Sequence, residues 1–89
     1  MGQVIAEVAH HTYITQDSNI CGGEPIIRET RFPVRSVVFY ILKEGMFPEE
    51  LVAEFPHLSL SAVCDALSYY YDHTEEIERL SSFSEDTDE

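Results

Sequence analysis

Three prolines and one glycine divide the chain from Pro33 onward into short segments, and their spacing limits what it can fold into. Pro33 can occupy the first turn of a helix, where a missing N–H costs nothing, and Gly45 is suited to end one. Between them, apolar side chains recur at the helical spacing i, i+3, i+4, i+7, i+8, namely Val34, Val37, Val38, Ile41 and Leu42. We therefore expect a helix that begins at Pro33 and ends before Gly45.

Two further helices are expected after this one. Pro48 is followed by Glu49 and Glu50, whose charges complement a helix dipole, and Pro56 stops this second helix after two turns. Ser59 can then cap a third helix. The apolar positions expected on the buried side of the third helix are Leu60, Val63, Cys64, Leu67, Tyr70 and Tyr71. A short helix, a tight turn and a longer helix give a helix-turn-helix outline.

Short β-prone runs precede the helices, at residues 13–15 and 25–28, and the residues between the runs favour turns. They predict a small hairpin. After the third helix we expect a break near residues 72–74, where Thr74 offers a fresh cap, and then helix as far as Leu80. The expected fold class is mostly α: a short N-terminal β-hairpin followed by a three- to four-helix helix-turn-helix bundle.

The negative charge is concentrated at the end of the chain. The net charge is −12, and residues 65–89 hold nine acids against the single cation Arg79. The last stretch, SSFSEDTDE, has too little apolar surface to order itself. We therefore expect one domain over residues 1–80 and an acidic flexible tail over residues 81–89. The tail either keeps the protein soluble or serves as a polyanionic arm for a basic partner.

Composition also narrows the class of protein. No apolar run approaches the roughly 18 residues of a membrane span, and the start lacks the pattern of a secretory signal, so we expect a cytoplasmic protein with both cysteines reduced. Neither CxxC nor HxxxH spacing is present, so we expect no metal. Catalytic and phosphate-binding patterns are also missing, which argues against an enzyme, a cofactor or a small-molecule substrate.

A chain of 89 residues buries little surface, so a second subunit would stabilise it considerably. Phe39 and Tyr40 lie opposite the expected core face of the first helix, and exposed apolar side chains of this kind usually mark association. We expect a homodimer with Phe39 and Tyr40 in its interface.

Two long stretches carry a resemblance to a known family. CGGEPIIRETRFPV and GMFPEELVAEFPHLSLSAVCDALSYYYDH resemble the bacterial family of domain of unknown function 433, over about residues 12–80. The resemblance implies a homeodomain-like helix-turn-helix fold and the role of antitoxin in a type II toxin–antitoxin pair, with a toxin similar to PIN-domain ribonucleases. Glu29 stands where the family generally has glycine, and Glu24 where a basic residue is common. If that glycine has a positive φ, Glu29 strains the turn.

The third helix is a poor candidate for reading DNA. We expect its surface to present Ser61, Asp65, Ser68 and Tyr69, with Ala62 beside them, and none of these makes bidentate contacts with bases. Aspartate also repels phosphate. The cations expected to contact DNA or a toxin all lie upstream, at Arg28, Arg31, Arg35 and Lys43. Alternatively, Arg31 and Arg35 pair with Glu24, Glu29 or Glu50 as ordinary surface ion pairs.

Two functions follow as expectations. The first is an antitoxin that neutralises a PIN-like ribonuclease and binds its own promoter DNA weakly as a dimer. For this role, Arg28, Arg31 and Arg35 would bond the carboxylates of the toxin, and residues 75–89 would meet its basic RNA-binding surface. The second is a protein-interaction module that has a helix-turn-helix shape without binding DNA.

Overall fold

The N-terminal part of the protein is a small antiparallel sheet. A computed structural model describes residues 5–7 and 10–86, with residues 5–7 and 82–86 described by their backbone alone. Strands β1 (Ile5–Glu7), β2 (Ile14–Asp17) and β3 (Pro25–Ile27) lie in the order β1-β2-β3. The hairpin of β2 and β3 confirms the sequence prediction, whereas β1 is an additional strand. The 3-10 turn η1 (Cys21–Gly23) connects β2 and β3.

The helix expected after Pro33 consists of two consecutive segments. It begins as α1 (Val34–Val38) and continues as the π-helical η2 (Phe39–Lys43). Pro33 was expected within the first turn of the helix, but its backbone is extended, so it is the N-cap and the helix begins at Val34. Gly45 ends the segment with a φ of +82°, as its position predicted, and the next N–H, that of Met46, donates back to the carbonyl of Tyr40 at 2.9 Å.

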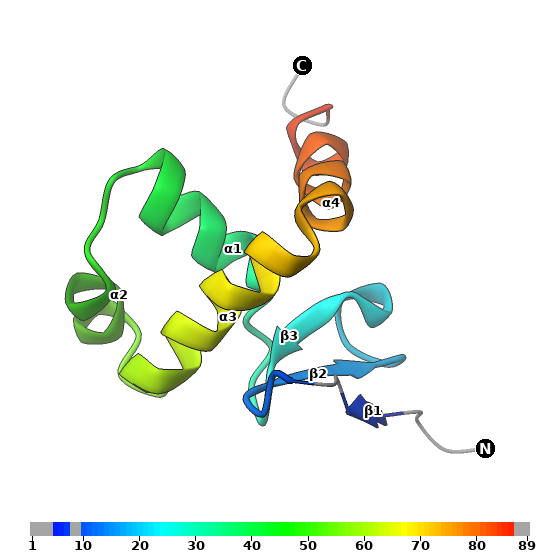
Figure 1. Ribbon diagram of the computed structural model, residues 1–89, viewed down its shortest axis with the longest axis horizontal. Helices are drawn as coiled ribbons and strands as arrows, with labels where there is room; N and C mark the ends of the chain where they lie inside the picture. The colour runs from blue at the N-terminus through cyan, green and yellow to red at the C-terminus, as the bar shows by residue number, and fades with distance from the viewer. Residues whose placement is uncertain (1–4, 8–9, 87–89) are drawn as a thin grey trace.

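Three further helices follow: α2 (Pro48–Glu54), α3 (Leu60–Asp72) and α4 (Thr74–Asp86). The N–H of Ala62 donates to the hydroxyl of Ser59 at 3.1 Å, which confirms Ser59 as a cap. The expected break falls at His73, but Thr74 does not cap α4: its hydroxyl donates back to the carbonyl of Tyr70. Figure 1 shows the sheet at one end of the helical part and α2 at the other.

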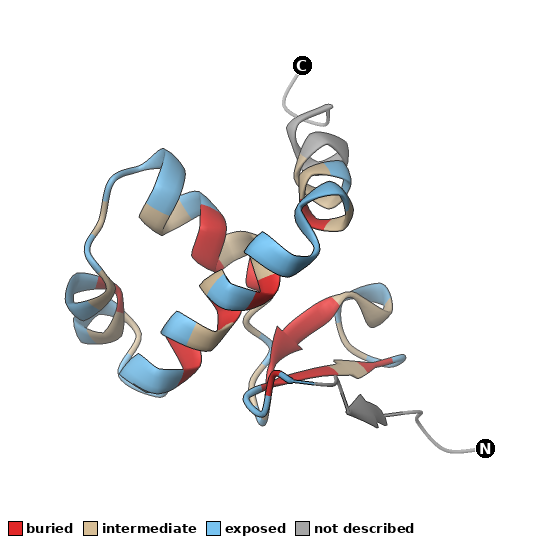
Figure 2. Cartoon of the chain, viewed as in Figure 1, coloured by how far each residue is buried: buried red, intermediate tan, exposed pale blue. Residues whose placement is uncertain are grey.

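The core joins one face of the sheet to α1, α2, α3 and α4. Its buried members are Ile14, Ile27, Val34, Val37, Val38, Leu51, Leu58, Ala62, Val63, Ala66, Tyr69 and Ile77. Figure 2 shows most of these buried segments on α1, α3 and the strands below them. The fold is therefore mostly α with an N-terminal sheet, as the sequence predicted.

The buried side of α3 differs from the expected one. Leu60, Cys64 and Tyr71 were expected inside but are exposed, while Ala62 and Ala66 are buried. Short side chains let helices pack closely, so Ala62 and Ala66 face the core together with Val63 and Tyr69. The end of the chain also differs in part: α4 extends to Asp86 and so includes residues 81–86 of the expected tail, while residues 87–89 lie outside the described part.

Candidate functional site

The cations expected to contact DNA or a toxin are mostly engaged within the fold. The Nε of Arg28 donates to the carbonyl of Thr12 at 2.9 Å. The Nε of Arg35 donates to the two carboxylate oxygens of Glu24 at 2.9 and 3.1 Å, so the alternative expectation of an internal ion pair is confirmed for Arg35. These two arginines hold the strands, the connecting segment and α1 together.

The remaining two candidate cations differ from each other. The Nζ of Lys43 lies 3.7 Å from a carboxylate oxygen of Glu78, so Lys43 connects η2 to α4. Arg31 is exposed, and no described carboxylate lies within ion-pair distance of its side chain. Arg28 and Arg31 border an open hollow of about 450 Å³, whose other lining residues are Thr15, Asp17, Ile20, Ile26, Glu29 and Thr30.

The surface expected for a recognition helix is only partly available. Ser61 and Ser68 are exposed on α3, as expected. Tyr69 was expected on this surface but is 3% exposed, because its ring packs against His11 and His73. The carboxylate of Asp65 is turned toward the sheet and accepts a hydrogen bond from the backbone N–H of Tyr13 at 2.9 Å. Neither Tyr69 nor Asp65 can therefore meet a ligand from solution as expected.

His11 connects the N-terminal sheet to α3, an arrangement that the sequence did not reveal. Its Nδ1 lies 3.0 Å from Asp65, and its Nε2 lies 2.9 Å from Asp72. With a proton on each ring nitrogen, both contacts are hydrogen bonds to carboxylates, so Asp65 and Asp72 favour the protonated form of the buried His11. Burial by itself lowers the pKa of His11, but the hydrogen bonds and charges of Asp65 and Asp72 outweigh it and raise the pKa above 6.5.

Two tyrosines connect α3 to α4 in a similar way. The hydroxyl of Tyr69 donates to Glu76 at 2.8 Å, and that of Tyr70 donates to Glu78. Burial and the Glu76 carboxylate both raise the pKa of Tyr69, while the carboxylate of Glu78 is the larger cause of the raised pKa of Tyr70. Both phenols therefore stay protonated and serve as structural donors. Tyr71, expected in the core with Tyr70, is 65% exposed.

Metal binding and a membrane span find no support in the described part of the chain. No group of three or more histidine, cysteine, aspartate or glutamate side chains there is placed to hold a metal ion. Asp65 and Asp72 contact different ring nitrogens of His11, so His11 separates the two carboxylates. Within the same residues, no helix combines the length and the apolar character that crossing a membrane requires.

The residues expected in a dimer interface have different environments. Phe39 is 47% exposed. Tyr40 is half-buried and packs against Phe32 and Phe55, with ring centroids 6.4 and 5.7 Å apart. Phe39 thus remains available to a second subunit, and Tyr40 mainly supports the aromatic cluster between η2 and α2.

Comparison with known proteins identifies the family. The family model described as "Protein of unknown function (DUF433)" matches residues 14–70, which is more than half of the chain. The chain belongs to the DUF433 family. The crystal structure of a DUF433 member protein from Anabaena variabilis matches with 36% identity and a TM-score of 0.70. The match covers 75% of this chain and 65% of the Anabaena chain, and no curated protein matches.

The two departures noted in the sequence have structural consequences in this DUF433 chain. Glu29 has a φ of +66°, in the left-handed region that glycine adopts without strain. Glu24 is the ion-pair partner of Arg35. The charge of Arg35 is therefore compensated inside this chain, which leaves Arg31 as the more accessible cation.

Proposed function

We propose that this DUF433 protein is the antitoxin of a type II toxin–antitoxin pair, and that it acts in the cytoplasm by binding a PIN-like ribonuclease. The proposal is based on the observation that most of the candidate cations are already engaged within the fold. Arg28, Arg35 and Lys43 contact oxygen atoms of the chain itself, and the sequence of α3 contains no lysine or arginine. DNA affinity depends on the number of phosphates that a protein neutralises. So few available cations favour a protein partner over DNA.

The charge of the chain supports a basic partner. A net charge of −12 attracts a surface rich in lysine and arginine and accelerates association with it. A ribonuclease offers such a surface, because it must bind the RNA backbone. A PIN-like toxin also holds a divalent metal through carboxylates, and the exposed guanidinium of Arg31 is suited to bond a carboxylate in two places.

The proposal predicts a gene for a PIN-like ribonuclease beside the gene of this chain, and an inhibition assay with that ribonuclease tests it. Its cleavage of RNA is measured with increasing amounts of the purified protein. We expect inhibition that is complete near one chain per toxin, with an association rate that falls as salt rises, because the attraction between opposite charges is screened. Full ribonuclease activity in an excess of the protein would contradict the proposed function.

Promoter binding is the second candidate, favoured by the exposed Arg31. A homodimer would present two copies of Arg31, yet binding should remain weak and steeply dependent on salt. In a gel shift with promoter DNA, Arg31→Ala should abolish the residual binding, while Ser61→Ala and Ser68→Ala on α3 should leave it intact. The reverse ranking would mean that α3 reads DNA after all.

A further inference from the structure

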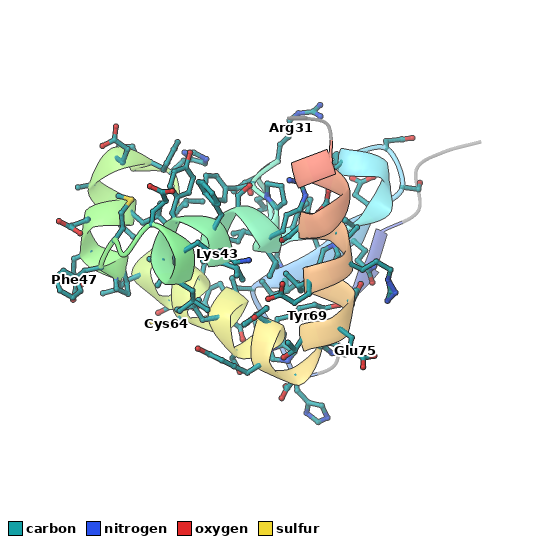
Figure 3. All side chains as sticks on the ribbon, turned by 90° about the horizontal axis from the view of Figure 1, so that it is seen from above. Arg31, Lys43, Phe47, Cys64, Tyr69 and Glu75 are labelled. Carbon is teal, nitrogen blue, oxygen red and sulfur yellow. The ribbon has the colours of Figure 1, made fainter. Side chains whose placement is uncertain are left out.

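The outward side of α3 bears an apolar stripe whose members, except Leu67, lie outside the core. The stripe consists of Leu60, Cys64, Leu67 and Tyr71, at the spacing i, i+4, i+7, i+11 that places side chains on one side of a helix. Leu60 is 43% exposed, Tyr71 is 65% exposed, Cys64 is also exposed and Leu67 is half-buried at the edge. Figure 2 shows exposed segments recurring along α3, and Figure 3 labels Cys64 on this helix.

The packing of α3 inside the protein depends on other residues. Ala62, Val63, Ala66 and Tyr69 face the core, and the N-cap Ser59 fixes where the helix begins. Helices that dock into a groove of another protein present apolar anchors at this type of spacing. Exposed apolar surface that packing does not require is typical of an interaction site. The α3 stripe therefore has the geometry of a helix that binds in a groove.

The charges beside the stripe indicate the chemistry of its partner. An open hollow of about 470 Å³ lies at the C-terminal end of α3, lined by Tyr71, Asp72, His73, Thr74, Glu75, Glu76 and Arg79. Asp72 is paired with His11, so Glu75 and Glu76 against Arg79 leave this end anionic, and α3 itself has no lysine or arginine. A second copy of the chain would bring like charges together, and nucleic acid would bring phosphates to the carboxylates.

We propose that the α3 stripe is the docking surface for the toxin, received by an apolar groove that has a lysine or arginine at the end that meets Tyr71. The inference rests on the proposed function, because it requires a basic protein partner. It assigns the second helix of the helix-turn-helix to protein recognition instead of DNA reading. It also assigns the anionic hollow to a cationic side chain of the toxin.

Native cysteines provide a footprint of the docking surface. Cys64 lies within the stripe and Cys21 lies in η1, with its Sγ 3.5 Å from the carbonyl of Arg31, and both are exposed. The rate of maleimide modification is measured at each cysteine, with and without the PIN-like ribonuclease encoded beside the gene. We expect the toxin to slow the modification of Cys64 by at least about tenfold, whether or not a contact of Arg31 with the toxin also protects Cys21. Protection of Cys21 with Cys64 still reactive would overturn the proposal and favour docking through Arg31.

Matched double variants separate the stripe from other exposed apolar side chains. Leu60→Gln with Tyr71→Gln removes the two ends of the stripe, and Phe39→Gln with Leu42→Gln changes a pair that is 47% and 44% exposed on η2. The dissociation constant for the toxin should rise at least about tenfold in the first pair and stay within about twofold in the second. Unchanged circular dichroism in both pairs would show that the helices remain.

The two proposals fail in different ways. If the wild-type chain neither binds nor inhibits the ribonuclease, the proposed function is wrong and the stripe loses its partner with it. If the wild-type chain inhibits the ribonuclease while Cys64 stays reactive and the Leu60 and Tyr71 variant binds as tightly as wild type, the docking surface alone is wrong.

Discussion

Glu29 shows how one side chain can reduce stability through its backbone. An L-residue at a φ of +66° costs about 1–2 kcal/mol, and glycine avoids this cost but loses about 0.5–1 kcal/mol of chain entropy on folding. We predict that Glu29→Gly raises the free energy of unfolding by roughly 0.5–1 kcal/mol, measured by urea denaturation. Glu29→Ala is the control, since it retains a Cβ atom. An equal gain in both variants would mean that the carboxylate, not the backbone, reduces stability.

His11 makes stability depend on pH. The folded protein binds a proton at His11 more tightly than the unfolded chain does, because Asp65 and Asp72 hold both ring nitrogens and raise the pKa above 6.5. The stabilisation is complete below pH 6.5 and is lost as pH rises through the raised pKa. We predict that the free energy of unfolding is larger for wild type than for His11→Gln, and that this difference falls as pH rises through the raised pKa. Denaturation of both proteins across a pH series measures the difference, and a difference that grows with pH would contradict the prediction.

At the scale of elements, the sequence predicted the bounds of helices better than their faces. Gly45 and the hydroxyl of Ser59 act locally, and so their roles could be predicted from neighbouring residues. The buried side of α3 depends on how closely α1 and the sheet approach it. The helical spacing of apolar residues therefore placed Cys64 in the core instead of Ala66.

The candidate site could be predicted only where its contacts are local or chemically obvious. The pair of Arg35 and Glu24 joins residues 11 apart and was among the expected alternatives. His11 meets Asp65 across 54 residues, and no spacing in the sequence indicates this contact. The outward stripe was missed for a related reason: the same apolar residues that predicted α3 were assigned to its core side.

Ala66 and Cys64 provide a direct test of the α3 face. Ala66 is fully buried, so Ala66→Leu must force its neighbours apart and should lower the free energy of unfolding by about 2 kcal/mol. Cys64→Leu adds apolar volume on the exposed side and should change stability by less than about 0.5 kcal/mol. Urea denaturation of the two variants measures both effects. A larger loss for Cys64→Leu would mean that α3 packs through the side first expected from its sequence.

For the whole molecule, charge and apolar surface act in opposite directions on assembly. Phe39, Leu42 and Phe47 are exposed by 47%, 44% and 69%, and they are the described apolar side chains of η2 and its following loop that remain available to a second copy. Each copy brings a net charge of −12, so association of two copies works against repulsion. Binding to a basic toxin gains from the same charge. Added salt should therefore affect the two assemblies with opposite signs.

Sedimentation velocity at low ionic strength and at about 0.15 M salt tests this difference in sign, since salt shortens the Debye length to about 8 Å and screens exposed charges. We predict that the homodimer fraction rises with salt, that Phe39→Ser lowers it at both salt concentrations, and that the complex with the PIN-like ribonuclease weakens over the same range. Cys64→Ser, on the stripe of α3, is the control that should leave the homodimer unchanged. A homodimer that dissociates as salt rises would require attraction between charges of the two copies, and the role given to Phe39 would then be wrong.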